Sequence, residues 1–235
     1  MNLLEARGLH TYYDASHILR GVDFTVRAGE TVGLMGRNGM GKTTLIRSLL
    51  GLVPPRRGEV RVRGDTMTGA SPHRIAQCGI AGVPEGRGIF PNLSVRENLV
   101  MAARAGIGGR RDWTLERVLD TFPRLGERLA HGGAQLSGGE QQMLTIGRAL
   151  MTNPDLLILD EATEGLAPKI AADIWNIVRR IRDTGIATVL VDKNHAAVTA
   201  VSDRNVILVK GEVVFNGSSA ALHADPALLH RHLGV

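Results

Sequence analysis

The stretch Thr31-Val-Gly-Leu-Met-Gly-Arg-Asn-Gly-Met-Gly-Lys-Thr-Thr44 decides the fold of this chain. Within it, Gly36 to Thr43 matches G-x-x-x-x-G-K-[ST], a loop whose backbone cradles phosphates. Thr31–Met35 is predicted to be a short buried strand, and the leucine and isoleucine spacing after the loop indicates a helix that ends at Gly51. Strand, loop and helix in this order are the context that the motif requires.

Each part of the loop has a role in holding a nucleoside triphosphate. The glycines let the backbone curl, so that successive N–H groups and the helix N-terminus point at one anion. Lys42 would neutralise the β- and γ-phosphates, and the Thr43 hydroxyl suits Mg²⁺, which prefers hard oxygen ligands. The phosphate-binding candidates are Gly36, Arg37, Asn38, Gly39, Gly41, Lys42, Thr43 and Thr44.

Length and composition favour one domain with an anionic ligand. The chain has 235 residues, and 28 Lys and Arg against 23 Asp and Glu give a net charge of +5. Aromatic residues are only 3% and no basic run is interleaved with them, so nucleic acid is not expected as a partner. The single Cys78 excludes an internal disulfide and suits a reducing cytosol. We find neither a signal peptide nor an apolar run of the ~20 residues that a spanning helix needs.

A second acidic motif follows a fully apolar run. Leu156–Leu159 is typical of a parallel strand covered on both faces, and it delivers Asp160 and Glu161 to the carboxyl end of the sheet. Neighbouring residues on a strand point opposite ways, so the two carboxylates should have different roles. We expect Asp160 to hold Mg²⁺ and Glu161 to orient and deprotonate the attacking water. A solvated turn would explain the acids but not the apolar run.

Two further strands are expected to end at the same edge. Ile80–Val83 stops before the charged loop Pro84–Gly88, which places Glu85 where a core strand ends. Ile186–Val191 stops before Asp192-Lys193-Asn194-His195, so Lys193 or His195 could reach the γ-phosphate. The residues alone leave the choice between these two side chains open.

The N-terminal region alternates as two antiparallel strands, Leu3–Leu9 and Val22–Val26, around a turn that contains Tyr12, Tyr13 and Asp14. An aromatic residue in a turn is exposed, so Tyr13 could stack on a nucleotide base or could be ordinary surface packing. Glu59–Arg63 alternates as a half-exposed strand of an edge hairpin.

The middle of the chain is helical in character. Ser94 and Glu97 form a capping box that opens a helix through Arg104, and Thr114–Phe122 is predicted to be another helix. Leu136-Ser-Gly-Gly-Glu-Gln-Gln142 has the same capping spacing from Ser137 to Glu140 and opens a longer amphipathic helix. Its two glycines would expose backbone N–H groups, although an ordinary helix start has the same pattern.

Three motifs in this order resemble the nucleotide-binding subunit of ATP-binding cassette (ABC) transporters: Gly36–Thr43, Leu136–Gln141 and the apolar strand ending in Asp160-Glu161. The resemblance implies an α/β P-loop NTPase fold with a mixed-sheet core, an antiparallel β-subdomain and an inserted helical subdomain. It implies one domain over residues 1–235, with the ATPase core at 1–90 and 155–235 and the helical subdomain and signature helix at 91–154.

The resemblance also implies how ATP and Mg²⁺ are used. In this family two cassettes close head to tail, so Ser137, Gly138 and Gly139 would bind the γ-phosphate held by the other cassette. Tyr13 matches the family's adenine-stacking aromatic residue. Glu85 stands where most members have Gln, and a carboxylate there can bind Mg²⁺ or its water. Lys193 aligns with the usual switch His and could contact the γ-phosphate as a point charge.

Other stretches are similar to the ATPases of branched-chain amino acid importers and of their amide and urea relatives: Val83–Pro91, Phe122–Leu125 and Glu164–Pro168. The closest likeness is to the smaller of two unlike ATPases. It implies a second ATPase subunit (an unlike paralogue, or a second copy), multi-spanning permease subunits, a periplasmic or extracellular solute-binding protein, and a peripheral place on the cytoplasmic side of the inner membrane. Ala162-Thr163 replaces the usual Pro-Ser, and Ala167 stands where many relatives have Asp.

Two other functions use the same motifs. A cassette ATPase acting on DNA or ribosomes usually has two fused cassettes or long coiled coils, and this chain has neither. The second alternative is an ATPase that drives the export of a lipid, and the Pro84-Glu85-Gly86-Arg87 loop favours import over export. The solute itself cannot be read from a subunit that touches only nucleotide and partner subunits.

Overall fold

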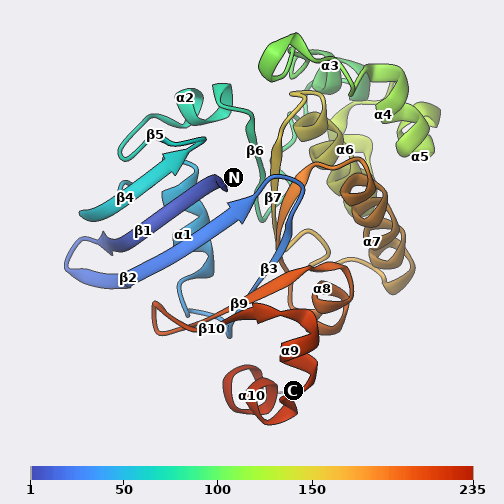
Figure 1. The fold of residues 1–235 in the computed structure, drawn as a ribbon. Coiled ribbons are helices and arrows are strands. Elements are labelled where there is room, and N and C mark those ends of the chain that lie inside the picture. Colours follow the sequence, from blue (N-terminus) through green and yellow to red (C-terminus); the bar gives the residue numbers. More distant parts are fainter. Residues whose placement is uncertain (1, 235) are drawn as a thin grey trace.

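The structure, a computed structural model, describes residues 2–234 and contains two β-sheets. A six-stranded sheet has the order β10-β9-β3-β8-β7-β6, and a four-stranded antiparallel sheet has the order β2-β1-β4-β5. In Figure 1 the antiparallel sheet, in blue and cyan, lies to one side of the central sheet, and most helices lie on the other side. The strands are β1 Asn2–Tyr13, β2 Ser16–Arg27, β3 Thr31–Met35, β4 Arg57–Val62, β5 Asp65–Thr66, β6 Ile80–Val83, β7 Leu156–Asp160, β8 Ala187–Val191, β9 Arg204–Val209 and β10 Glu212–Ser218.

The central sheet is parallel apart from β10, and side chains cover both of its faces. Alternate residues of β7 illustrate this: Leu156 and Ile158 pack with α1 and the antiparallel sheet, whereas Leu157 and Leu159 pack with α6 and α7. A strand of period two that is buried on both sides must be apolar throughout. The continuous apolar runs of the sequence therefore identify these strands correctly.

The glycine-rich loop joins β3 to α1 as its motif predicts. The helix α1 runs from Lys42 to Leu49, with Leu50 as its C-cap and Gly51 at φ 73°. It packs Leu45 and Leu49 between the two sheets, where both side chains are buried. The predicted strand, loop and helix are confirmed.

Helices from the middle of the chain form a group beside the sheet, drawn in green at the upper right of Figure 1. This group contains α3 Val95–Val100, α4 Leu115–Thr121 and α5 Pro123–Glu127, followed along the chain by α6 Gly138–Leu150. The remaining helices are α2 Pro72–Gln77, α7 Pro168–Asp183, α8 His195–Val201, α9 Ser219–His223 and α10 Pro226–Leu233, with 3₁₀ turns at Ile107–Gly109 and Gly133–Gln135. Both predicted capping boxes are present, at Ser94 with Glu97 and at Ser137 with Glu140.

Two boundary predictions are wrong. The helix from Ser94 ends at Val100 and not at Arg104, because the Arg104 backbone N–H bonds the Met151 carbonyl and its guanidinium bonds Ala76. Tyr12 and Tyr13 lie in β1 and not in the turn, which is only Asp14 and Ala15. The Tyr12 ring stacks on His17 of β2, with ring centres 4.2 Å apart, and this cross-strand pair extends the hairpin.

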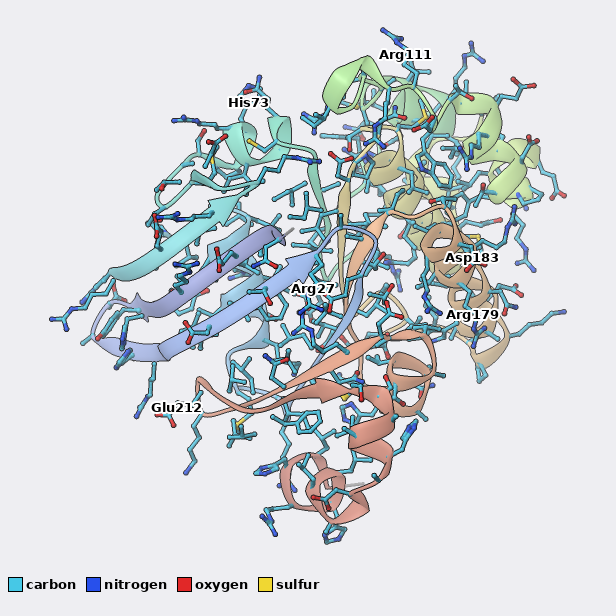
Figure 2. The ribbon with its side chains drawn as sticks, viewed as in Figure 1. Arg27, His73, Arg111, Arg179, Asp183 and Glu212 are labelled. Atoms are coloured by element: carbon cyan, nitrogen blue, oxygen red, sulfur yellow. The ribbon has the colours of Figure 1, made fainter. Side chains whose placement is uncertain are left out.

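Most charged side chains lie on the outside of the molecule, while Lys42, Asp160 and Asp192 are buried. Figure 2 shows this for Arg111 above the middle helices, for Arg179 and Asp183 on α7, and for Glu212 at the β9–β10 hairpin. Among the helices of residues 2–234, none is long and apolar enough to cross a membrane.

Candidate functional site

Most of the predicted site residues meet at one edge of the central sheet. The strands β3, β6, β7 and β8 run parallel, so the loops after Met35, Val83, Asp160 and Val191 leave the sheet on the same side. Between these loops lies a cavity of about 480 Å³. Its lining residues are Ile18, Asn38, Gly39, Gly41, Lys42, Thr43, Thr44, Glu85, Glu161, Glu164 and Lys193.

The phosphate loop curls tightly because its glycines adopt positive φ angles: 148° at Gly36, 76° at Gly39 and 104° at Gly41. A Cβ atom at Gly36 would lie 2.4 Å from the Leu208 carbonyl oxygen, so no other residue fits there. The Lys42 Nζ donates to the Gly36 carbonyl at 2.7 Å and to the Arg37 carbonyl at 3.2 Å. The lysine therefore lies across the hollow of the loop, and burial lowers its pKa.

The turn between β9 and β10 packs against the phosphate loop and holds it in position. The Gly211 N–H, between β9 and β10, donates to the Met40 carbonyl at 3.0 Å, and the Gly211 carbonyl accepts from Arg20 at 2.9 Å. A Cβ atom at Gly211 would lie 1.7 Å from the Ile18 carbonyl oxygen. This close approach of three segments fixes the position of the loop and of Ile18 at the cavity wall.

Asp160 is the last residue of β7 and is only 3% exposed. Burial raises the pKa of its carboxyl, while a hydrogen bond from the Thr43 hydroxyl opposes that rise. Its Oδ1 has no hydrogen-bond partner among residues 2–234. A buried carboxylate oxygen without a partner, next to a hydroxyl, fits the hard-oxygen ligand set of Mg²⁺.

Glu161 follows at φ 51°, a conformation that few residues other than glycine adopt. Its backbone N–H continues the sheet by donating to Val191 at 2.8 Å, and its side chain joins a cluster of charges. Its Oε2 lies 3.7 Å from the Lys193 Nζ. A hydrogen bond with the Glu164 carboxyl, burial and the charge of Glu164 together raise the pKa of Glu161 to about 7.

Two further carboxylates lie beside Glu161. Oxygen atoms of Glu85, Glu161 and Glu164 all lie within 4.8 Å of one another, and Lys193 forms an ion pair with Glu164. This pair raises the pKa of Lys193, and the bonds to Glu161 and Lys193 lower the pKa of Glu164. Sequence reasoning did not single out Glu164 as a site residue, although its spacing three residues after Glu161 was visible.

Asp192 was also missed, and it ties two of the loops together. Its Oδ2 accepts from the Thr163 backbone N–H at 3.2 Å and from the Thr163 hydroxyl at 2.5 Å. Its Oδ1 accepts from the Asn194 N–H at 2.9 Å. The carboxylate therefore holds the loop after β7 against the loop after β8. Its position at the end of an apolar strand was the available signal.

Lys193 and His195, the two candidates after β8 for contact with the γ-phosphate, lie in different places. Lys193 lines the cavity, whereas His195 begins α8, does not line it and is half-buried. Burial and the nearby charge of Lys42 lower the pKa of His195, which favours the neutral ring. In the described part of the chain its Nδ1 has no hydrogen-bond partner.

Seven of the predicted residues do not line this cavity. Gly36, Arg37 and Asp160 belong to the loop and the strand end beside it, whereas Tyr13 and the residues that open α6 lie elsewhere. Tyr13 ends β1 and is 38% exposed, and two residues separate it from the start of β2. Ser137, Gly138 and Gly139 open α6, where Ser137 is exposed and its hydroxyl accepts from the Glu140 N–H. A Cβ atom at Gly139 would lie 2.4 Å from Ile170, and one at Gly138 would lie 2.8 Å from the Arg87 guanidinium. Both glycines therefore allow close packing at the start of this helix.

The ABC transporter family matches residues 19–164, the part that holds the phosphate loop, the start of α6 and the Asp160-Glu161 pair. The chain belongs to the ABC transporter family. It is a subunit that binds and hydrolyses ATP, with the α/β fold of a P-loop NTPase. The match covers more than the motifs, because the matched region also includes β2 from Leu19 onward and the helices α2–α6.

Similar proteins extend the match over nearly the whole chain. It is 40% identical over 224 residues to the high-affinity branched-chain amino acid transport ATP-binding protein BraG of Pseudomonas aeruginosa, covering 95% of this chain and 96% of that protein. It is 35% identical to a probable branched-chain amino acid transport ATP-binding protein, LivF, of Archaeoglobus fulgidus, covering 94% of both. The lipopolysaccharide export ATP-binding protein LptB of Escherichia coli is 32% identical, covering 100% of this chain and 98% of that protein.

A solved structure of an ATP-binding subunit of an ABC transporter superposes with a TM-score of 0.84 at 30% identity, covering 99% of this chain and 96% of the other. A nucleotide-free ATP-binding cassette superposes with a TM-score of 0.81 at 25% identity, covering 97% and 98%. The predicted fold class is therefore confirmed.

Proposed function

We propose that this ATPase powers the import of branched-chain amino acids, or of a related small polar solute, through membrane permease subunits. The observation that carries the chemistry is the single cavity in which Lys42, Thr43, Glu161 and Lys193 line the same space. The relatives from Pseudomonas aeruginosa and Archaeoglobus fulgidus support the class of solute.

The geometry supports the following residue roles. The loop N–H groups and Lys42 hold the phosphates, and Thr43 and Asp160, with Glu85 at the cavity wall, would hold Mg²⁺. When bound, Mg²⁺ neutralises charge on the β- and γ-phosphates. Glu161 accepts a proton from the attacking water, for which its pKa near neutrality is suited. Lys193 contacts the γ-phosphate as a point charge.

A second cassette completes the site in this proposal. Ser137 is exposed at the start of α6, where its backbone and hydroxyl can meet a phosphate held by another subunit. Tyr13 supplies an exposed ring for the adenine. The second cassette is an unlike paralogue or another copy of this chain.

The permease subunits would dock on a groove next to the nucleotide cavity. This groove has a volume of about 470 Å³ and a largely apolar wall that includes Leu52 and Ile80. Arg104 and Arg148 line it as well, and the loop that starts at Glu85 forms one side. The exposed Phe90 ring of that loop lies under the Arg148 guanidinium, 4.5 Å from ring centre to Cζ. Such a surface fits a short amphipathic helix from a permease on the cytoplasmic face of the membrane.

Lipopolysaccharide export is the second candidate, because the Escherichia coli export protein is also similar over the whole chain. Purification of the tagged protein from native membranes in mild detergent, followed by mass spectrometry, separates the two. Import predicts co-purification with two multi-spanning subunits, a second cassette ATPase and a solute-binding protein whose ligand names the solute. Recovery with lipid-export components, or with ribosomal proteins and no membrane subunit, would overturn the import proposal.

A further inference from the structure

Lys193 is held on one side of the nucleotide cavity by two carboxylates. Its Nζ forms an ion pair with the Glu164 Oε1 and lies 3.7 Å from the Glu161 Oε2. The side chains of Lys193 and Glu164 are 53% and 36% exposed, so both can move without disturbing the core. Both residues line the cavity that also contains Lys42 and the phosphate loop.

We propose that Glu164 sets the preference of this site for ATP over ADP, because it competes with the γ-phosphate for the Lys193 ammonium. The inference rests on the proposed function, in which the phosphate loop holds the nucleotide and Lys193 faces the γ-phosphate. In addition to these residues, which bind the nucleotide, Glu164 is a residue that opposes triphosphate binding. Glu164 would keep the affinity for ATP below the value that the cavity could otherwise reach.

Two electrostatic effects of Glu164 have the same sign. The carboxylate occupies the lysine, so that a γ-phosphate must displace it before it gains the contact. The same carboxylate also adds negative charge within 4.8 Å of Glu85 and Glu161, and so repels a triphosphate more than a diphosphate. ADP lacks the group that would compete, so its affinity should change little when Glu164 is altered.

The expected size is modest because the ion pair is exposed. Such pairs contribute little in water, which corresponds to a change of about two- to fivefold in an equilibrium constant. A purely structural surface pair would instead change the affinities for ATP and ADP equally, or change neither. The ratio of the affinities for ATP and ADP therefore distinguishes competition for Lys193 from a purely structural ion pair.

The test uses isothermal titration calorimetry on the full chain with Mg²⁺, comparing ADP with adenylyl imidodiphosphate, a non-hydrolysable ATP analogue. Glu164→Gln should tighten the analogue roughly two- to fivefold and leave ADP unchanged. Glu127→Gln, at the exposed end of α5, makes the same change in charge away from the cavity and should change neither affinity. Lys193→Met should weaken the analogue and leave ADP unchanged.

The double variant tests whether Glu164 acts through Lys193. In the Lys193→Met background, Glu164→Gln should produce a clearly smaller gain for the analogue than in the wild-type chain. An unchanged ratio of affinities in Glu164→Gln, an equal change for ADP, or full additivity in the double variant would each overturn the inference. Lys42→Ala distinguishes these failures from that of the proposed site: if it retains wild-type affinity for both nucleotides, the site itself is wrong.

Discussion

At the scale of single residues, a hydrogen bond with the Glu164 carboxyl, burial and the charge of Glu164 set the protonation of Glu161. Its pKa is raised to about 7, so below that pH the carboxyl is mostly protonated and cannot accept a proton from water. We therefore expect kcat/KM for ATP, which reports the titration of the nucleotide-free protein, to rise with pH by up to about tenfold per unit below pH 7 and to level off above it. The measurement is kcat/KM between pH 5.5 and 9, with protein stability followed in parallel. A flat profile between pH 6 and 8 would contradict this assignment of the base.

The second prediction concerns the same side chain. Glu161→Gln keeps the size and the hydrogen-bonding oxygen but removes the base, so turnover should fall at least about a hundredfold while ATP binding persists. Single-turnover hydrolysis and equilibrium nucleotide binding, measured on one preparation, give the two values. Glu116→Gln on α4, exposed and remote from the cavity, is the matched control. Wild-type turnover in Glu161→Gln would assign the base to another group.

At the scale of elements, the sequence predicts those segments whose own residues decide their structure. β3, the phosphate loop, α1 and β7 are correct because apolar runs and glycines allow few other conformations there. The end of α3 was wrong because a tertiary contact decides it: Arg104 leaves the helix to bond Met151 and Ala76. Glu164 was missed for the same reason, since only the folded loop brings it to Glu161 and Lys193.

Asn98 shows how one side chain fixes the element next to the Glu85–Phe90 loop. Its fully buried amide accepts from the Phe90 N–H at 2.9 Å and donates to the carbonyls of Phe90, Leu93 and Ser94. Asn98→Ala removes these four hydrogen bonds and leaves the Phe90 N–H without this partner, although each of the three carbonyls keeps a backbone N–H donor. We therefore expect a loss of about 2–3 kcal/mol in the free energy of unfolding. Urea denaturation measures it, with the exposed Asn92→Ala as control. Equal stability of the two variants would show that water replaces the amide.

At the scale of the whole molecule, contacts between distant segments hold the parts together, and no local pattern predicts them. Asp155, just before β7, is the clearest case. Its carboxylate pairs with Arg63 from the β4–β5 turn and with Arg110 from the segment between α3 and α4. Gly79 leaves room for this carboxylate, since a Cβ atom there would lie 2.6 Å from its Oδ2. One acid thus connects the antiparallel sheet, the central sheet and the helical group.

This connection gives the last prediction. The Asp155 side chain is only 14% exposed, but its two arginines are 38% and 48% exposed, so solvent weakens both pairs. We expect Asp155→Asn to lower the free energy of unfolding by about 1–2 kcal/mol and to speed amide hydrogen exchange at residues 104–113 more than in α1. Asp120→Asn, exposed on α4, should change neither quantity. If exchange speeds up equally in both regions, Asp155 stabilises the fold as a whole; if only the arm around Arg110 responds, the acid acts as the tether that holds the helical group to the ATPase sheet.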